Sequence, residues 1–326
     1  MKKLLFVIQM LWCICSFAQQ QIVVSGWNSA VTLPSDYSYT SVTYPTLIFY
    51  PGLGEVGTNY NALIQNGPHA YLSQGGSIPG FIVISLQPSS AYPTEYSMNL
   101  RLDVLKSLYR IDVNRINLTG LSHGGWCSST YVSGGYPNIK SIITVEGVIP
   151  DDNSPYPQGF NNWYGRHLCF EQRLDGRGGL GLINYINSIH PGQGIFYETN
   201  FGGGGHCCWS NFYGGQGTQP GKWILDGKLQ NIYEWLRDVN NISVVSLSQD
   251  SIRERLKKHQ FYFNHEQIII RSSKSSNYQM FNNIGQLIDK GFYKAGTTTI
   301  PIDLYKPGIY FIKTEFITYK FLINKR

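Results

Sequence analysis

Charged residues are scarce in this sequence, and long apolar runs are scarcer. Asp, Glu, Lys and Arg make up 14% of the 326 residues, whereas hydrophobic residues make up 42%. Such a composition allows a buried core and argues against intrinsic disorder. After residue 18, no apolar run approaches the roughly 20 residues that a membrane-spanning helix needs. We therefore expect folded domains without a transmembrane segment.

A net positive charge is also lacking from most of the chain. The net charge is +6 and the pI is about 8.9. Residues 244–326 carry 13 Lys and Arg against 6 Asp and Glu, a net of +7, and residues 1–243 carry 13 against 14, a net of −1. The basic residues are scattered and follow no recognised nucleic-acid-binding module, so we expect no nucleic-acid partner.

Cysteine is sparse, and no pair has the C-x-x-C spacing of common metal sites. Two of the six cysteines fall in an N-terminal segment that resembles a signal peptide, with Lys2 and Lys3, an apolar stretch over 4–15 and small residues before Gln19. We therefore predict a signal peptide at 1–18. Export would permit disulfides.

The remaining cysteines are Cys127, Cys169, Cys207 and Cys208. Cys169 and one of the Cys207/Cys208 pair lie at neighbouring predicted strand ends, where a bridge could fix the loops of the acid and the base, and the pairing of the four cysteines is left open. A metal site formed by His206, Cys207 and Cys208 is disfavoured because adjacent residues chelate poorly. We expect neither a metal nor a cofactor.

The most informative motif that is present is G-L-S-H-G at 120–124. It fits G-x-S-x-G, the nucleophile elbow, in which a serine occupies a strained turn between a strand and a helix. Residues 116–119 read as the strand, and the small residues 124–133 read as the helix. Gly120 and Gly124 would let the two backbones approach closely. This pattern makes Ser122 the candidate nucleophile, at a helix N-terminus where N–H groups can stabilise an oxyanion.

Buried strand patterns surround the motif. Apolar runs at 46–50, 81–86, 141–146, 167–171 and 195–199 alternate with helix patterns, including one at 179–190. Alternating strands and helices predict an α/β fold with a doubly wound, mostly parallel sheet. The run 46–50 leads into P-G-L-G-E at 51–55, the position of the second oxyanion donor in α/β-hydrolases.

The general base and the acid should follow the serine in the order acid, then histidine. His206 stands out among the downstream histidines because four glycines at 202–205 bring it in after a strand. Asp175, in a turn beyond the strand 167–171, is the best-placed acid. Glu171 is the rival candidate, and Glu146 is a third and weaker one.

Several ordered motifs resemble one family. These are L-P-S-D-Y at 33–37, P-G-L-G-E-V-G at 51–57, the strand ending in Gln87 and Pro88, G-L-S-H-G-G at 120–125, G-H-C-C-W-S-N-F-Y at 205–213 and I-Y-E-W-L at 232–236. Residues from about 33 to 236 resemble the secreted α/β-hydrolase esterases related to poly(3-hydroxybutyrate) depolymerases, feruloyl esterases and predicted peptidases.

The resemblance implies a triad of Ser122, Asp175 and His206. It also implies an oxyanion hole formed by the N–H groups of Leu53 and His123. Tyr50-Pro51 stands where the family has Leu-His, and Glu171-Gln172 stands where it often has His-Gly. The second departure leaves the acid open between Asp175 and Glu171.

The pattern changes near residue 240. Short strand-like runs follow at 267–271, 278–281, 297–302, 309–314 and 319–323, with turns between them, which predicts a small antiparallel β-sandwich. F-N-N-I-G at 281–285, L-Y-K-P-G-I-Y-F at 304–311 and K-F-L-I-N-K at 320–325 resemble the C-terminal sorting domain of type IX secretion substrates. That resemblance implies export from a Gram-negative cell through the type IX machinery.

These patterns predict a signal peptide at 1–18, an α/β-hydrolase domain at 19–241, a linker at 242–260 and a sorting domain at 261–326. The expected activity is hydrolysis of a small-molecule or polymeric carboxylic ester by a secreted or cell-surface serine hydrolase. A serine peptidase on the same fold and an inactive, surface-binding hydrolase fold are the alternatives. Trp163, Tyr164 and Trp209 could favour a phenolic or polymeric substrate, although core positions explain them equally well.

Overall fold

The computed structural model describes residues 19–136, 138–147, 158–242, 259–263, 267–282, 286–303, 305–314 and 318–323. Contacts divide the chain into two units, one of residues 19–34 and 44–241 and the other of 35–43 and the described residues from 242 onward. The predicted signal peptide and most of the predicted linker lie outside the described residues. Within these residues, no helix is long and apolar enough to cross a membrane.

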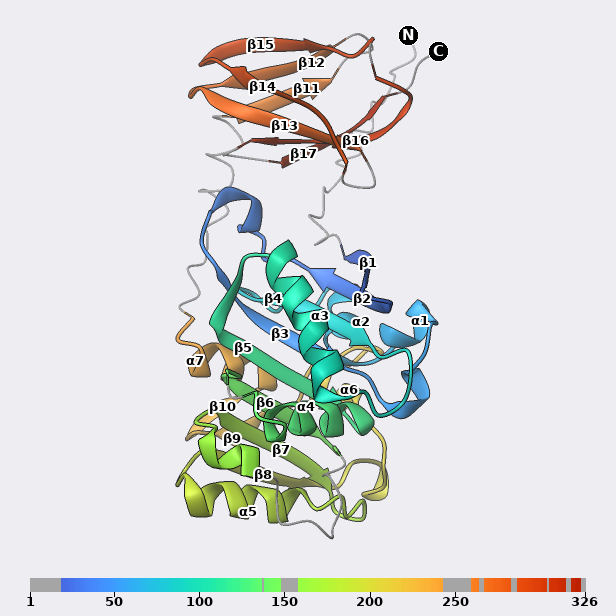
Figure 1. Cartoon of the computed structure of the whole chain (residues 1–326), viewed down its shortest axis with the longest axis vertical. Coiled ribbons are helices and arrows are strands. Elements are labelled where there is room, and N and C mark those ends of the chain that lie inside the picture. Colours follow the sequence, from blue (N-terminus) through green and yellow to red (C-terminus); the bar gives the residue numbers. More distant parts are fainter. Residues whose placement is uncertain are drawn as a thin grey trace, which may run out of the picture. The chain divides into compact units, whose positions relative to one another are not determined.

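The first unit is built on an eight-stranded sheet in the order β1-β2-β4-β3-β5-β6-β7-β8 (Figure 1). The strands are β1 (Gln20–Val24), β2 (Trp27–Thr32), β3 (Tyr44–Tyr50), β4 (Ile82–Gln87), β5 (Ile111–Leu121), β6 (Ser141–Val145), β7 (Arg166–Gln172) and β8 (Gly194–Thr199). The hairpin β1–β2 joins β4 antiparallel, and the other neighbouring pairs are parallel.

The helices of this unit follow the strands in turn. They are α1 (Tyr60–Leu63), α2 (Gly67–Ser73), α3 (Glu95–Leu108), α4 (His123–Ser133), α5 (Gly179–Ile189), α6 (Ser210–Tyr213) and α7 (Ile232–Val239). The short 3-10 turns η2 (Leu53–Glu55), η3 (Gln158–Asn162) and η4 (Phe201–Gly203) lie in the connections, and β9 (Trp223–Leu225) pairs with β10 (Lys228–Gln230).

Alternate side chains of β5 show that helices cover both faces of the sheet. Asn117 bonds to Asn240 at the end of α7, and Thr119 bonds to Tyr213 of α6. Gly120, on the opposite face, lies against α4, where an added Cβ would come 2.1 Å from the Gly124 carbonyl carbon. Because successive strand residues point to opposite faces, α6 and α7 cover one face and α4 covers the other. All seven residues of β3 are buried, as expected for a central parallel strand covered on both sides.

The strand order places the site. From β3 the chain moves to β4 on one side and then to β5 on the other, so the connections leaving β3 and β5 diverge. In open α/β sheets, ligands bind beyond the carboxyl ends of strands at such a switch point. The segment after β3 is the predicted oxyanion loop, and the residue after β5 is Ser122.

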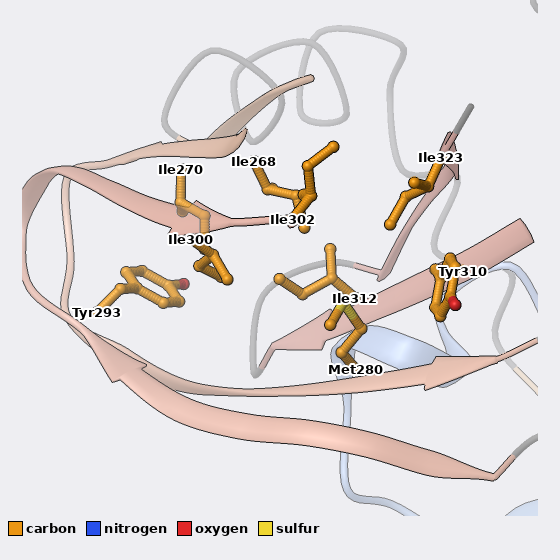
Figure 2. Close-up of a cluster of buried hydrophobic side chains, with 9 residues drawn as sticks. All are labelled: Ile268, Ile270, Met280, Tyr293, Ile300, Ile302, Tyr310, Ile312 and Ile323. Carbon is orange, nitrogen blue, oxygen red and sulfur yellow. The ribbon is translucent and has the colours of Figure 1, made fainter. Parts of the chain in front are cut away.

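The second unit contains two antiparallel sheets, β11-β12-β15 and β14-β13-β16-β17. The strands are β11 (His259–Phe263), β12 (Gln267–Ser272), β13 (Ser276–Asn282), β14 (Leu287–Tyr293), β15 (Gly296–Pro301), β16 (Gly308–Thr314) and β17 (Thr318–Ile323), and η1 (Tyr37–Tyr39) also belongs to this unit. Figure 2 shows buried side chains from both sheets meeting in one core, including Ile268, Ile300, Met280 and Ile312. This is the expected β-sandwich.

Two strands of this unit were missed by the sequence patterns. β11 begins at His259, where the sequence reads as a polar linker. β14 has an almost entirely exposed or half-exposed pattern and an internal glycine, so it shows no clear apolar alternation. β11 contains the strand-favouring run F-Y-F at 261–263, which was overlooked, whereas β14 is specified by its pairing with β13 rather than by local sequence.

Candidate active site

Ser122 occupies a sharp turn between β5 and α4. Its φ of 50° and ψ of −120° lie in a region that L-residues rarely adopt. The Ser122 N–H donates to the Val145 carbonyl over 2.9 Å, which holds the turn against β6. Room for this turn depends on glycine, since a Cβ added to Gly124 would lie 1.9 Å from the Tyr50 carbonyl oxygen. The local structure has the form of a nucleophile elbow.

The structure brings together three of the sequence-predicted residues. His206 Nε2 lies 2.8 Å from Ser122 Oγ, and His206 Nδ1 lies 2.8 Å from Asp175 Oδ2. With its proton on Nδ1, the ring donates to Asp175 and accepts from the Ser122 hydroxyl. The His206 side chain is 30% exposed and Asp175 only 3%, so the base is open to a substrate while its partner is buried. This arrangement can raise the nucleophilicity of the hydroxyl.

Glu171, the rival acid, has a different role in the structure. Its carboxylate accepts hydrogen bonds from the backbone N–H groups of Arg177 and Gly179 and thereby folds the loop after β7. That loop carries Asp175, whose second oxygen accepts a 2.8 Å bond from Arg177 Nε. Glu171 therefore shapes the segment that presents Asp175, and the geometry favours Asp175 as the partner of His206.

Glu146 lies closer to the base than its third rank among the predicted acids suggests. Its Oε2 is 3.4 Å from His206 Nδ1 and accepts a 3.0 Å bond from the Cys207 N–H. The side chain is fully buried. Burial, followed by the nearby Asp175 charge, raises the pKa of Glu146 to about 8. Both causes favour the protonated form of Glu146 near neutral pH.

The predicted oxyanion hole lies between the end of β3 and the start of α4. His123 is the first residue of α4, directly after Ser122. A Cβ added to Gly52 would lie 3.8 Å from the Ser122 Cβ, so the loop after β3 runs beside the nucleophile. The Gly52 N–H donates to Glu55 Oε2 over 2.7 Å, and Asn66 also donates to this carboxylate. Glu55 thus fixes the turn that carries the next amide, that of Leu53.

The cysteine pairing, which the sequence left open, is defined in the structure. Cys207 and Cys208, adjacent in sequence, form a disulfide with one another, while Cys169 and Cys127 are buried free thiols. The structure therefore settles the open pairing without the bridge from Cys169 that the sequence allowed. The disulfide follows His206 directly and packs on Gly202, where an added Cβ would lie 2.9 Å from both sulfurs. A disulfide between adjacent cysteines needs an unusual backbone turn, and here Cys208 has a φ of 72°. The spacing of the cysteines in the sequence does not show that such a turn will form.

One group of side chains has the spacing of metal ligands among the described residues. Glu146, Asp175 and His206 each offer a ligand atom, and these atoms lie within 4.8 Å of one another. The same His206 Nδ1 is already bonded to Asp175. The sulfurs of Cys207 and Cys208 are bonded to each other, which removes them as thiolate ligands. We assign no metal to the site.

Aromatic rings flank the nucleophile and the base. Trp209 stands edge-on to the His206 ring with centroids 4.8 Å apart. Tyr92, which the sequence did not single out, has a φ of 56° and contacts the rings of His123 and Trp126. Trp163, in contrast, is fully buried and donates to the Ile139 carbonyl.

Tyr164 precedes β7 and so lies at the amino end of the strand, away from Ser122. Of the three predicted aromatics, only Trp209 borders the site.

Several solved structures are similar to part of this chain. A thermostable esterase superposes with a TM-score of 0.51 at 20% identity, covering 68% of this chain and 62% of its own. MGS-M1, an α/β-hydrolase enzyme from a Medee basin deep-sea metagenome library, gives 0.47 at 15% identity and coverages of 69% and 98%. A fungal esterase from Rhizomucor miehei gives 0.44 at 14%, with coverages of 69% and 82%.

No family model matches the chain, and no curated protein matches it. The chain spans less than two thirds of the thermostable esterase. The likeness to that esterase, together with the mostly parallel eight-stranded sheet, shows that the first unit has the α/β-hydrolase fold. The predicted fold class is confirmed.

Proposed function

We propose that this protein is a serine hydrolase that cleaves carboxylic esters through an acyl-enzyme intermediate. The observation that carries the proposal is the unbroken chain from Ser122 Oγ through both nitrogens of His206 to Asp175, with 2.8 Å at each step. The strained elbow beneath Ser122 and the likeness to a thermostable esterase support it.

The geometry accommodates both half-reactions. Ser122 Oγ attacks the ester carbonyl carbon while its proton passes to His206 Nε2, and Asp175 stabilises the resulting imidazolium. The amides of Leu53 and His123 would hold the negative charge on the carbonyl oxygen. His206 then returns the proton to the leaving alcohol as the C–O bond breaks. Water activated by the same nitrogen releases the acid and restores Ser122.

Hydrolysis of short-chain aryl esters, combined with labelling by a fluorophosphonate, tests the assignment. The wild-type protein should turn over the ester and gain one phosphonyl group on Ser122. Ser122→Ala should lower turnover by about 10⁴-fold or more while leaving the unfolding transition unchanged, because the hydroxyl supplies the bond-forming atom. Ester hydrolysis that survives in this variant would remove Ser122 from the mechanism. Cleavage of peptides but not of esters would instead favour the peptidase alternative.

We further propose that the protein is exported, with the second unit serving as a type IX sorting domain. The antiparallel β-sandwich of this unit and its sequence motifs support the proposal. Fusing residues 242–326 to a periplasmic reporter in a type IX-competent host tests it. Appearance of the reporter outside the cell is the expected result, and retention in the periplasm would contradict the proposal.

A further inference from the structure

Two carboxyl groups converge on the same nitrogen of His206. Asp175 Oδ2 lies 2.8 Å from Nδ1, and Glu146 Oε2 lies 3.4 Å from it. They come from the ends of adjacent parallel strands, β7 and β6 respectively. A serine hydrolase needs one acid at this position. The second carboxyl group is therefore unexplained by the proposed mechanism.

The backbone of Glu146 is fixed by the surrounding structure. Its N–H donates to the Phe170 carbonyl over 2.7 Å, and its φ of 50° is rare for a residue with a side chain. Such strain persists where the surrounding structure requires it, often at functional sites. The side chain of Gln172, at the end of β7, also interacts with the Glu146 carboxyl group.

Glu146 also holds the segment that carries the base. Its Oε2 accepts the N–H of Cys207, the residue directly after His206. The 3.0 Å bond ties the histidine loop to the end of β6. The same oxygen faces His206 Nδ1. One carboxyl group therefore contacts both the backbone of the histidine loop and the imidazole ring of His206.

The charged and titratable groups facing Glu146 come from two loops. Asp175 and Arg177 belong to the segment between β7 and α5, and His206 belongs to the segment after β8. Burial and then the Asp175 charge favour the protonated form of Glu146. The Cys207 N–H, the Gln172 side chain and the Arg177 charge favour the charged form. The Asp175 charge therefore helps to keep Glu146 neutral, and its removal would favour the Glu146 carboxylate.

We propose that Glu146 is a positioning residue for His206 and the reserve acid of the site, able to act as the partner of Nδ1 when Asp175 is replaced. The inference rests on the proposed serine hydrolase function. At neutral pH in the intact protein, Asp175 is the charged partner and Glu146 positions the loop as a neutral group. Without the Asp175 carboxylate, Glu146 ionises and stabilises the imidazolium in its place.

Four full-length variants test this: Asp175→Ala, Glu146→Gln, the double variant, and Glu198→Gln as a control that removes an exposed carboxylate of β8. The readouts are the rate of Ser122 phosphonylation by a fluorophosphonate and kcat for an aryl ester between about pH 5 and 9, the range that spans the expected titration. Asp175→Ala should lose about 10²-fold, well short of the roughly 10⁴-fold loss that follows disruption of the acid in a serine protease. The double variant should lose about 10⁴-fold, whereas Glu146→Gln alone should lose less than about tenfold because the amide keeps the acceptor for Cys207.

The pH profile separates a reserve acid from a structural role. The rate of Asp175→Ala should exceed that of the double variant by a factor that grows with pH as Glu146 ionises, because every other pH dependence of the rate is common to the two variants. Equal rates for Asp175→Ala and the double variant at every pH would overturn the inference while leaving the serine mechanism intact. Failure of the wild-type protein to label at Ser122 would overturn both. If the alanine variant does not fold, Asp175→Ser, with and without Glu146→Gln, provides the same comparison, because serine also lacks the carboxylate and has no amide to oppose Glu146 at Nδ1.

Discussion

At the scale of single residues, the site assigns different tasks to chemically similar carboxyl groups. Asp175, Glu171 and Glu146 lie near the ends of two adjacent strands, yet only Asp175 approaches His206 within 2.8 Å. The Glu171 carboxylate is occupied by two backbone N–H groups of its own loop. What distinguishes the three is the set of donors that each one faces, and this follows from how the loop after β7 turns.

Asp175→Asn should therefore reduce ester hydrolysis far more than Glu171→Gln. The asparagine amide cannot offset the imidazolium charge and can stabilise the wrong tautomer, whereas a glutamine in place of Glu171 retains an oxygen acceptor for the loop. We expect kcat to fall by at least about 10-fold more in the first variant, measured at saturating ester and neutral pH. The opposite ranking would transfer the role of the acid to Glu171.

Glu146 should make the stability of the protein depend on pH. Its pKa is about 8 in the folded protein against an ordinary value of 4.5. Between these values the folded state binds more protons than the unfolded state, so this residue's contribution to stability falls as pH rises from about 4.5 to about 8. Glu146→Gln does not titrate and should become more stable relative to the wild-type protein across that window.

Urea unfolding at about pH 5, 7 and 9 measures this difference. The gap in the free energy of unfolding between Glu146→Gln and the wild-type protein should widen in favour of the variant as pH increases. Glu198→Gln serves again as the exposed control and should show no such trend. A constant gap for Glu146→Gln would mean that this carboxyl group is not held protonated.

At the scale of elements, the elbow is a contact between three backbones. The start of α4 touches the end of β3 and the end of β5, with glycines at the closest points. Helix α4 is also almost entirely buried, so it cannot move away from the sheet to relieve a collision. The geometry of the nucleophile therefore depends on atoms that take no part in the chemistry.

Gly124→Ala should destabilise the protein and remove most activity. The added methyl group would lie 1.9 Å from the Tyr50 carbonyl oxygen, which forces strand β3 and helix α4 apart. We expect a loss of about 1–3 kcal/mol in the free energy of unfolding, as for other overpacked core positions. Gly54→Ala is the matched control for stability, because its Cβ would meet no atom within 4 Å. Equal stabilities for the two variants would contradict this account of the elbow.

The sequence was sufficient to predict those elements whose signals are local. The G-x-S-x-G motif, the buried strands and the glycine run before His206 each lie within a short window, and they led to Ser122, Asp175 and His206 as candidates. The β1–β2 hairpin was overlooked although its signal is local, because its turn is formed by Ser25 and Gly26 alone. In contrast, β14 shows no clear apolar alternation and the contacts of Tyr92 join distant parts of the chain, so no local pattern marked them. The bridge from Cys169 that the sequence allowed does not form, because the proximity of two strand ends does not fix where a side chain points.

At the scale of the whole molecule, the excess of basic residues and the proposed catalytic residues lie in different units. All proposed catalytic residues lie within the unit of residues 19–34 and 44–241. The basic excess lies in residues 244–326. The second unit has its own buried core, which shares no residue with the first (Figure 2).

A chain of residues 19–241 should therefore fold alone and keep the ester hydrolysis kinetics of the intact protein on a soluble ester. The α/β unit is large enough to bury its own apolar surface, and its last helix, α7, ends before the boundary. Circular dichroism and kcat/KM measured on both chains test this. If the shortened chain folds but loses activity on soluble esters, the second unit contributes to the site. If it loses only polymer binding, the second unit is a substrate-binding module.

The disulfide beside His206 has a consequence for the order of events during maturation. A bond between neighbouring residues closes a loop of one peptide unit, so it restricts the unfolded chain very little and adds little through chain entropy. It also links no two strands or helices. The sheet can therefore assemble while both thiols are still reduced, and oxidation can come afterwards as a finishing step confined to the histidine loop. An exported protein built in this way would need no disulfide-shuffling catalyst to reach its native topology.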